Sequence, residues 1–519
     1  MKNMNLQIYN DNPISFPSDK KIVCVGYSAK HLKCFGEETG RLRDIDLIID
    51  DNPKNQGTRQ AENHTVSVVG FDKSDGLKPE ETVLLIMDDY FGEQFERVQA
   101  DPYLSSKFET VWVYLDRESR IYHNYTVKYR EDPLRDLIVF RSGPHSSAYV
   151  KGTDFSDNAR AVFEYMLSTG LNEKYELVWL VKDPEDDRYA PYRQKNVRFI
   201  SFDLSDNEDE ALCEEYYDVL CHAKFIFMTD AYGFCRYTRG DQTRVQLWHG
   251  CGFKTRVNFV RCEKRYEYMP VISPVYAKIH KDIYGLRDDQ VHITGYPKED
   301  WLFHSMENWK EKLGIGDAKH YIFWLPTFRT PHSQLSGLKM EEHAGETGLS
   351  FVLGKSELQK LEDLLAEEDT ILLIKLHPFQ DRSVVRVDGM EHIHIIENSD
   401  LIKEDIEINR LMAYADAMIS DYSSAAIDYL MLDRPLGFTI DDIDEYEKGR
   451  GFVFDPIRDW LPGAEIDSFD ALCTFISEIS RGEDSSGEKR KRLRAKLHDF
   501  SDDNSCRRLL EDLKIPEKE

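Results

Sequence analysis

Short apolar runs alternate with stretches of helical periodicity along nearly the whole chain. Representative runs are Leu177–Val181, Ile371–Leu376 and Ala417–Ser420, which lack the apolar–polar alternation of half-exposed strands. Continuous apolar runs of this kind are typical of parallel strands that are covered on both faces. Their alternation with helices indicates repeated βα units. The predicted fold class is therefore α/β, with doubly wound parallel sheets.

The length of 519 residues corresponds to about three domains at roughly 150 residues each. A small Rossmann-like accessory domain is predicted over residues 1–118, with strands at Lys21–Gly26, Asp44–Ile49, Thr82–Met87 and Thr110–Leu115. No GxGxxG follows the first strand, so Gly26 is interpreted as a tight turn and not as a dinucleotide site. The polar residues 117–136 are predicted to be a linker.

Two larger α/β domains are predicted over residues 137–272 and 273–515. The strands expected in the first are Leu137–Arg141, Leu177–Val181, Val197–Ile200, Phe225–Thr229 and Val245–Trp248, with a helix at Asp157–Thr169 capped by Ser156. Those expected in the second are Val291–Thr294, Tyr321–Leu325, Ile371–Leu376, Ile393–Ile396, Ala417–Ser420 and Leu436–Phe438, followed by a helical end. Because ligands bind at the carboxyl ends of parallel strands, we expect a site in the cleft between these domains.

Composition excludes several functions. A net charge of -28 argues against nucleic-acid binding, which needs a basic surface. No secretory leader is expected at the N-terminus, and no apolar run approaches the roughly 20 residues of a membrane span. The nine cysteines form no CxxC pair, as expected for reduced thiols of a cytosolic protein.

Two apolar strands are expected to end on histidines. His249 stands in Gln246-Leu247-Trp248-His249-Gly250, with Lys254 shortly after, and His377 follows Lys375 and Leu376. A histidine titrates near neutral pH and can act as a general base, and Gly250 would let a substrate approach the backbone. Each histidine alone could equally be packed or solvated, but two in strand-end positions make chance a weaker explanation.

Two further loops carry cationic side chains. Pro326-Thr327-Phe328-Arg329 presents a hydroxyl and a guanidinium together, and arginine is suited to bidentate phosphate binding. Gly295-Tyr296-Pro297-Lys298-Glu299-Asp300 offers Lys298, yet by itself it is best interpreted as a turn. The alternative to phosphate binding by Arg329 is that this arginine simply lies on the protein surface.

The run Ser420-Asp421-Tyr422-Ser423-Ser424 joins a strand to a helix that contains Asp428. Free N–H groups and the positive dipole at such a helix start favour a diphosphate, and the serine hydroxyls add donors. Ordinary N-capping is the common alternative and can coexist with phosphate binding. Because Asp421 would repel phosphate, we expect it to turn away and to cap backbone groups or orient Lys375 or His377.

These motifs occur in a characteristic order, followed by Glu445–Phe452 and Phe454-Asp455 and preceded by Asp157–Arg160 and Trp179–Val181. Together they resemble the poly(glycerol phosphate) glycerophosphotransferase family, over residues 137–455. One departure is Cys251-Gly252-Phe253, where the family usually has a Thr-Pro-Leu-like stretch. This difference leaves the identity of the acceptor open.

The resemblance implies a GT-B-like pair of Rossmann-like domains facing a cleft, without metal or cofactor. It implies transfer of glycerol phosphate or ribitol phosphate from a CDP-alditol to a terminal hydroxyl of a teichoic-acid-like or capsular polymer, or a lipid-linked acceptor, with release of CMP. Carried over to this sequence, it makes His249 and His377 catalytic and places the donor diphosphate at Ser423 and Ser424. Further donor contacts are predicted from Gly250, Lys254, Thr327, Arg329, Lys375, Ser420, Asp421 and Asp428.

Two other functions stay open on the sequence. A GT-B glycosyltransferase using a nucleotide sugar would share the fold and the diphosphate site. A non-catalytic polymer-binding protein would not need two strand-end histidines. The sequence does not distinguish a glycerol donor from a ribitol donor. We expect a cytoplasmic protein that can associate peripherally with the inner face of the cell membrane.

Overall fold

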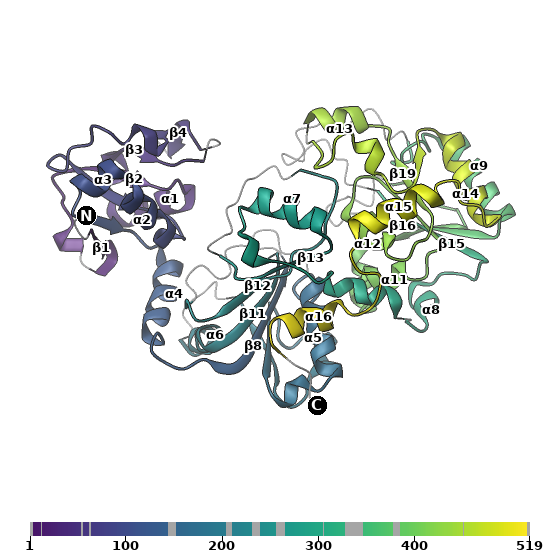
Figure 1. Ribbon diagram of the computed structural model, residues 1–519, viewed down its shortest axis with the longest axis horizontal. Coiled ribbons are helices and arrows are strands. Elements are labelled where there is room, and N and C mark those ends of the chain that lie inside the picture. Colours follow the sequence, from purple (N-terminus) through teal and green to yellow (C-terminus); the bar gives the residue numbers. More distant parts are fainter. Residues whose placement is uncertain are drawn as a thin grey trace. The chain divides into compact units, whose positions relative to one another are not determined.

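Strands and helices alternate through the computed structural model, as the apolar pattern predicts (Figure 1). The structure describes residues 4–11, 13–52, 55–61, 64–143, 152–203, 210–230, 239–255, 265–304, 306–326, 346–376, 385–449 and 451–515. Its contacts divide the chain into two units. The first unit is Met1–Leu134, Asp209–His222 and Gly233–Asp241, and the second is Arg135–Glu208, Ala223–Tyr232 and Gln242–Glu519.

The first unit contains a seven-stranded sheet in the order β1-β7-β6-β2-β3-β5-β4. Its strands are β1 (Asn5–Ile8), β2 (Lys21–Val25), β3 (Ile45–Ile49), β4 (Gly57–Ala61), β5 (His64–Val69), β6 (Thr82–Ile86) and β7 (Thr110–Val113). The four predicted strands are present as β2, β3, β6 and β7. Sequence reasoning missed β4 because it is polar, lies at the edge of the sheet and pairs antiparallel with β5.

The predicted linker over residues 117–136 is wrong, because most of it forms α4 (Arg117–Lys128). The Asp116 carboxylate caps this helix by accepting a hydrogen bond of 2.8 Å from the Ser119 N–H. Helix α4 packs on α6 (Glu210–His222), where the ring of Tyr125 stacks on that of Tyr217 at 4.7 Å. The buried surface of α4 is formed by tyrosine side chains, so the composition of the segment indicated a solvent-exposed linker. The other helices are α1 (Ala29–Thr39), α2 (Phe91–Ala100) and α3 (Pro102–Lys107).

The second unit contains two larger sheets in which all neighbouring strands are parallel. The five-stranded sheet has the order β10-β9-β8-β11-β12, from β8 (Arg135–Gly143), β9 (Glu176–Val181), β10 (Val197–Ser201), β11 (Ala223–Asp230) and β12 (Thr243–Gln246). The six-stranded sheet has the order β17-β16-β15-β18-β19-β20, from β15 (His320–Leu325), β16 (Thr370–Lys375), β17 (Ile393–Ile396), β18 (Ala417–Ser420), β19 (Leu436–Thr439) and β20 (Ala464–Ile466). Strands β13 (Met269–Val271) and β14 (Val291–Ile293) form a separate pair. A mixed α/β fold with parallel sheets is thus confirmed.

Helices cover both sheets of the second unit. They are α5 (Asp157–Ser168), α7 (Pro274–Tyr284), α8 (Trp309–Leu313), α9 (Lys355–Glu367), α10 (Asn398–Lys403), α11 (Ile408–Met412), α12 (Ser424–Leu430), α13 (Ile443–Gly449), α14 (Phe469–Ser480), α15 (Gly487–Leu497) and α16 (Ser505–Asp512). Figure 1 shows α16 beside α5, although the two are far apart in sequence. Leu509 and Leu510 of α16 share a core with Ile138 and Phe140 of β8, so the end of the chain packs on the five-stranded sheet.

The start of α5 differs from the prediction in one detail. Ser156 occupies the N-cap position, but its side chain makes no capping hydrogen bond. Its hydroxyl donates instead to the carbonyl of Thr153, at 2.9 Å.

The predicted domain boundaries at 118, 137, 272 and 515 stay predictions. Within the part of the chain that the structure describes, no helix has the length and apolarity to cross a membrane.

Candidate active site

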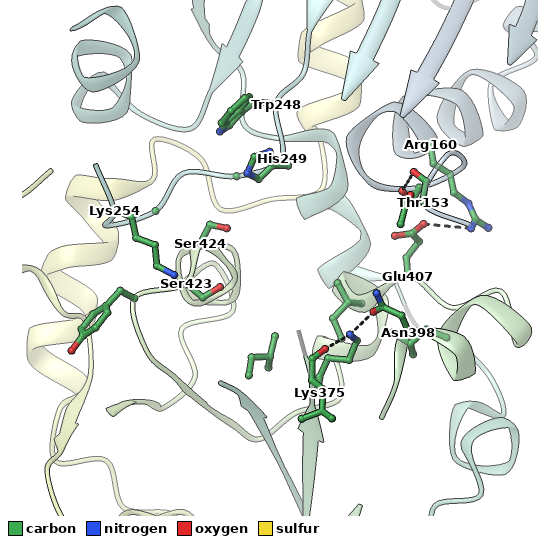
Figure 2. Close-up of a pocket in the computed structure, with 18 of the residues that line it drawn as sticks. Thr153, Arg160, Trp248, His249, Lys254, Lys375, Asn398, Glu407, Ser423 and Ser424 are labelled. Carbon is green, nitrogen blue, oxygen red and sulfur yellow. Dashed lines mark hydrogen bonds and ion pairs between the residues drawn. The ribbon is translucent and has the colours of Figure 1, made fainter. Parts of the chain in front are cut away.

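A cavity of about 940 Å³ lies at the carboxyl ends of the strands of both large sheets in the second unit (Figure 2). Its wall includes residues that come directly after β12, β15, β16 and β18, namely Trp248, His249, Pro326, Leu376, Tyr422 and Ser423. Parts of α5, α7 and the segment before α11 also contribute to the lining. This is where ligands bind in open α/β sheets, and the strand-end motifs meet there.

His249 lies on a tight loop after β12. Two residues of the loop have positive φ angles, +57° at Trp248 and +150° at Gly250. The main-chain carbonyl of Trp248 accepts a 3.0 Å hydrogen bond from the side-chain amide of Asn158, and that of His249 accepts one from the Lys298 ammonium. The loop is therefore held through its backbone, which leaves the His249 side chain in the cavity wall.

Gly250 brings the His249 loop against the start of α12. A Cβ at Gly250 would lie 2.9 Å from the hydroxyl oxygen and 3.0 Å from the Cβ of Ser424. A side chain here would force Ser424 or the loop to shift, and the positive φ also favours glycine, so both the contact and the backbone angle favour glycine at this position. Figure 2 shows His249 and Ser424 on these neighbouring segments.

The other residues near α12 divide into two groups. Ser423, Ser424 and Lys254 line the cavity, and Ser423 also caps the helix by accepting a 3.4 Å hydrogen bond from Ala425 N–H. Ser420, Asp421 and Asp428 are 0%, 2% and 2% exposed and are absent from the described lining. Their predicted contact with the donor stays a prediction, and the structure places them behind the cavity wall.

Lys375 ends β16 in the cavity wall and is 8% exposed. Its ammonium donates a 2.7 Å hydrogen bond to the Leu376 carbonyl and another to the side-chain oxygen of Asn398 (Figure 2). Burial lowers the pKa of Lys375 to about 8, although Asp400 and Glu397 favour its charged form. Its charge is thus sensitive to pH in a range where an arginine would not be.

An ion-pair cluster borders the same cavity. Arg160 of α5 forms two 2.8 Å bonds to Asp405 and lies 3.4 Å from Glu407. Burial raises the pKa of Glu407 to about 7, against the opposing effect of Arg160. Charged side chains from α5 and from the segment between α10 and α11 thus meet at one wall of the cavity.

Side chains spaced to hold a metal ion, among those that the structure describes, are His31, Asp89 and Asp116. All three belong to the first unit, and the Lys30 ammonium lies 2.6 Å from Asp116. The described lining of the cavity contains His249 and His280 but no such group.

Residues 124–514 match the model of the CDP-glycerol:poly(glycerophosphate) glycerophosphotransferase family. The chain belongs to this family. The match includes both large sheets and every segment of the cavity wall. The family predicted from the ordered motifs is thereby confirmed, and the predicted alditol-phosphate transferase class agrees with it. A CDP-glycerol donor and a polymer acceptor fit this family.

Curated relatives of this glycerophosphotransferase-family chain are teichoic acid enzymes. The ribitol-phosphate polymerase TarL of Staphylococcus aureus is 23% identical over 376 residues, which are 69% of this chain and 60% of TarL. A teichoic acid glycerol-phosphate transferase of the same organism is 24% identical over 67% of this chain and 85% of its own length. The chain thus spans less than two thirds of TarL. The solved wall teichoic acid polymerase TagF shares the fold, with a TM-score of 0.56, 21% identity, and coverage of 76% of this chain and 93% of that one.

Three predicted site residues of this family member lie outside the described residues: Thr327, Arg329 and His377. Pro326 and Leu376, which directly precede these two segments, do line the cavity. The roles of the three therefore stay predictions.

Sequence reasoning missed several residues of the site. Asn158 and Lys298 hold its loop, and Arg160, Asn398 and Glu407 line the cavity. The signal was present for three of them, because Lys298 and the run Asp157–Arg160, which contains Asn158 and Arg160, belong to the family-like motifs. Because Lys298 was interpreted as part of a turn, the burial of its ammonium group was not predicted.

Proposed function

We propose that this protein transfers glycerol phosphate or ribitol phosphate from a CDP-alditol to a terminal hydroxyl of a teichoic-acid-like or capsular polymer. The acceptor oxygen forms a bond to the alditol-bearing phosphorus, the bond from that phosphorus to the bridging oxygen breaks, and CMP leaves. The observation that carries the proposal is the family match over 124–514 around a cavity with His249 in its wall.

The proposed architecture is a GT-B-like pair formed by the two large sheets, with the first unit as a Rossmann-like accessory domain. The parallel order of both sheets and the cavity at their carboxyl ends support this assignment. In such an arrangement, the five-stranded sheet would serve the acceptor and the six-stranded sheet would serve the donor. His249 would then lie where the two substrates meet.

In the proposed reaction, His249 accepts the proton of the attacking hydroxyl. Phosphoryl transfer otherwise needs positioning and stabilisation of phosphate charge. Lys254, Lys375, Ser423 and Ser424 line the cavity and would supply this stabilisation. Arg329, Thr327 and His377 would add to them from segments that continue from the same wall.

The proposed acceptor is a growing polymer or its lipid-linked primer. A lipid-linked primer would bring the protein to the inner face of the cell membrane, as a peripheral partner. The net charge of -28 would oppose binding to anionic lipid, so the acceptor would have to supply the attraction. Flotation of the protein with vesicles that contain or lack such a primer tests this point.

The nucleotide released from a panel of donors tests the proposed function. CDP-glycerol and CDP-ribitol should yield CMP in the presence of acceptor, whereas nucleotide sugars should yield nothing. Release of a nucleoside diphosphate from a nucleotide sugar would instead identify a glycosyltransferase. Tight polymer binding without any nucleotide release would identify a polymer-binding protein.

Donor affinity should depend on pH through Lys375. Its pKa of about 8 means that the ammonium is charged below pH 8 and neutral above it. The KM for CDP-glycerol should therefore be flat below pH 7 and rise above pH 8, toward a roughly ten- to hundredfold limit for loss of a charged hydrogen bond of about 1.5–3 kcal/mol. Lys375→Arg should keep KM flat to pH 9.5. A wild-type KM unchanged across this range would contradict the assignment.

The hydroxyls at the start of α12 should contribute to donor binding. Replacing Ser423 and Ser424 together by Ala should raise KM by about two- to tenfold for each hydroxyl, since a neutral hydrogen bond is worth ~0.5–1.5 kcal/mol. Arg329→Ala should raise it further. Because Ser423 also caps α12, melting temperatures must be measured beside the kinetics. An unchanged KM in the double variant would remove these serines from the donor site.

A further inference from the structure

Lys298 is a buried cation that does not line the cavity. It lies near the start of the 3-10 helix Pro297–Phe303 and is 5% exposed. Its ammonium is 3.1 Å from the carboxylate of Asp428 and 3.6 Å from that of Asp157, and it donates to the His249 carbonyl. A buried charge is costly unless it is paired and hydrogen-bonded, so this arrangement needs all of these partners.

The partners of Lys298 come from three elements that meet at the cavity. Asp428 lies on α12, Asp157 begins α5, and the His249 carbonyl belongs to the loop after β12. Although burial disfavours the charge, Asp157 and Asp428 raise the pKa of Lys298 above its ordinary value. The ammonium therefore stays charged and joins the helix that carries Ser424 to the loop that carries His249.

Asn158 completes the same support. Asn158 is fully buried, and its side-chain amide donates hydrogen bonds to the main-chain carbonyls of Leu247 and Trp248 at 3.4 and 3.0 Å. Its side-chain oxygen accepts a hydrogen bond of 3.0 Å from the main-chain N–H of Lys298. Trp248 has a φ of +57°, a conformation that costs a non-glycine residue roughly 1–3 kcal/mol and persists only when its surroundings impose it. The two buried side chains impose it here.

We infer that Lys298, supported by Asn158, is a positioning residue that fixes the His249 loop on the start of α12. It does not touch substrate. It sets the distance between the proposed base and the serines proposed to bind the donor. This inference rests on the proposed function and extends it to a residue outside the cavity wall.

The test compares Lys298→Met with wild type for CMP release, donor binding and melting temperature. Since a displacement of about 1 Å can cost roughly 100-fold, kcat per folded protein should fall about 100-fold. The Kd for CDP-glycerol, measured by calorimetry, should change by less than threefold, and Lys298→Arg should restore part of kcat. If Lys298→Met does not fold, Lys298→Gln, which removes the charge and keeps a polar side chain beside Asp157 and Asp428, carries the same expectation.

Arg490 provides a matched control. It is 3% exposed and bonds to Asp433 at 3.0 Å, and it does not line the cavity. Arg490→Met should lower the melting temperature and leave kcat near wild type. A kcat within threefold of wild type in folded Lys298→Met would overturn the inference.

A second measurement separates positioning from general stability. In the His249→Ala background, adding Lys298→Met should produce no further loss in single-turnover CMP release, because the base is already gone. Losses that multiply would overturn the inference. If wild-type protein releases no CMP, the proposed function fails; if it releases CMP and these outcomes are absent, only the inference fails.

Discussion

His249→Ala should lower CMP release by about 10²–10⁴-fold, the usual cost of losing a general base, while the fold is retained. His249 lies in the cavity wall, and the hydrogen bonds that Asn158 and Lys298 make to its loop go to main-chain carbonyls. Substitution of the side chain leaves those bonds in place. Direct chromatographic assay of CMP, together with the melting temperature, separates loss of chemistry from loss of structure.

His304→Ala is the control for this variant. That histidine is 55% exposed, pairs with Asp503 at 3.6 Å and lies outside the described lining. It should retain wild-type turnover. If His249→Ala also keeps near wild-type turnover, His249 is not the base and the proposed mechanism is wrong.

Gly250→Ala should lower kcat by about 100-fold, because small displacements of catalytic groups have effects of this size. Gly250 has a φ of +150°, and a Cβ there would lie 2.9 Å from the Ser424 hydroxyl oxygen. The loop and Ser424 must shift relative to each other to make room, and an alanine at this φ is strained in any case. That movement separates His249 from the serines, so the loss should appear in kcat at saturating donor.

Gly252→Ala in the same loop is the matched comparison. Its Cβ would meet Ser424 at 3.5 Å, an ordinary contact. We expect less than a fivefold change. Equal effects of the two substitutions would show that the close approach of Gly250 to Ser424 has no special importance.

Strand-end positions were predictable because apolar runs and the residues that stop them are local features. The runs expected to end at Leu325 and at Ser420 both end where the structure ends β15 and β18. Once the strands of the six-stranded sheet are parallel, their carboxyl ends share one edge, so Lys375 and Ser423 lie on the same side of that sheet. His249 follows β12 of the other sheet, so its position near them depends on how the two sheets face each other. Burial on both faces of β9 and β16 follows from the same pattern.

Features that depend on tertiary pairing could not be predicted in this way. The burial of Lys298 depends on Asp157 and Asp428, which lie in distant parts of the chain. Helix α4 looked like a linker because its packing on α6 uses tyrosine rings and not aliphatic side chains. In both cases the local sequence is polar, so it gave no indication that these side chains are buried.

Mass spectrometry of the acceptor after incubation with CDP-glycerol tests the central claim most directly. The account predicts products heavier than the acceptor by whole numbers of glycerol phosphate units, formed with one CMP per unit and absent with His249→Ala. CDP-ribitol in a parallel reaction identifies the alditol that the enzyme prefers. An acceptor that gains a sugar from a nucleotide sugar, or gains nothing from either CDP-alditol, would contradict the account.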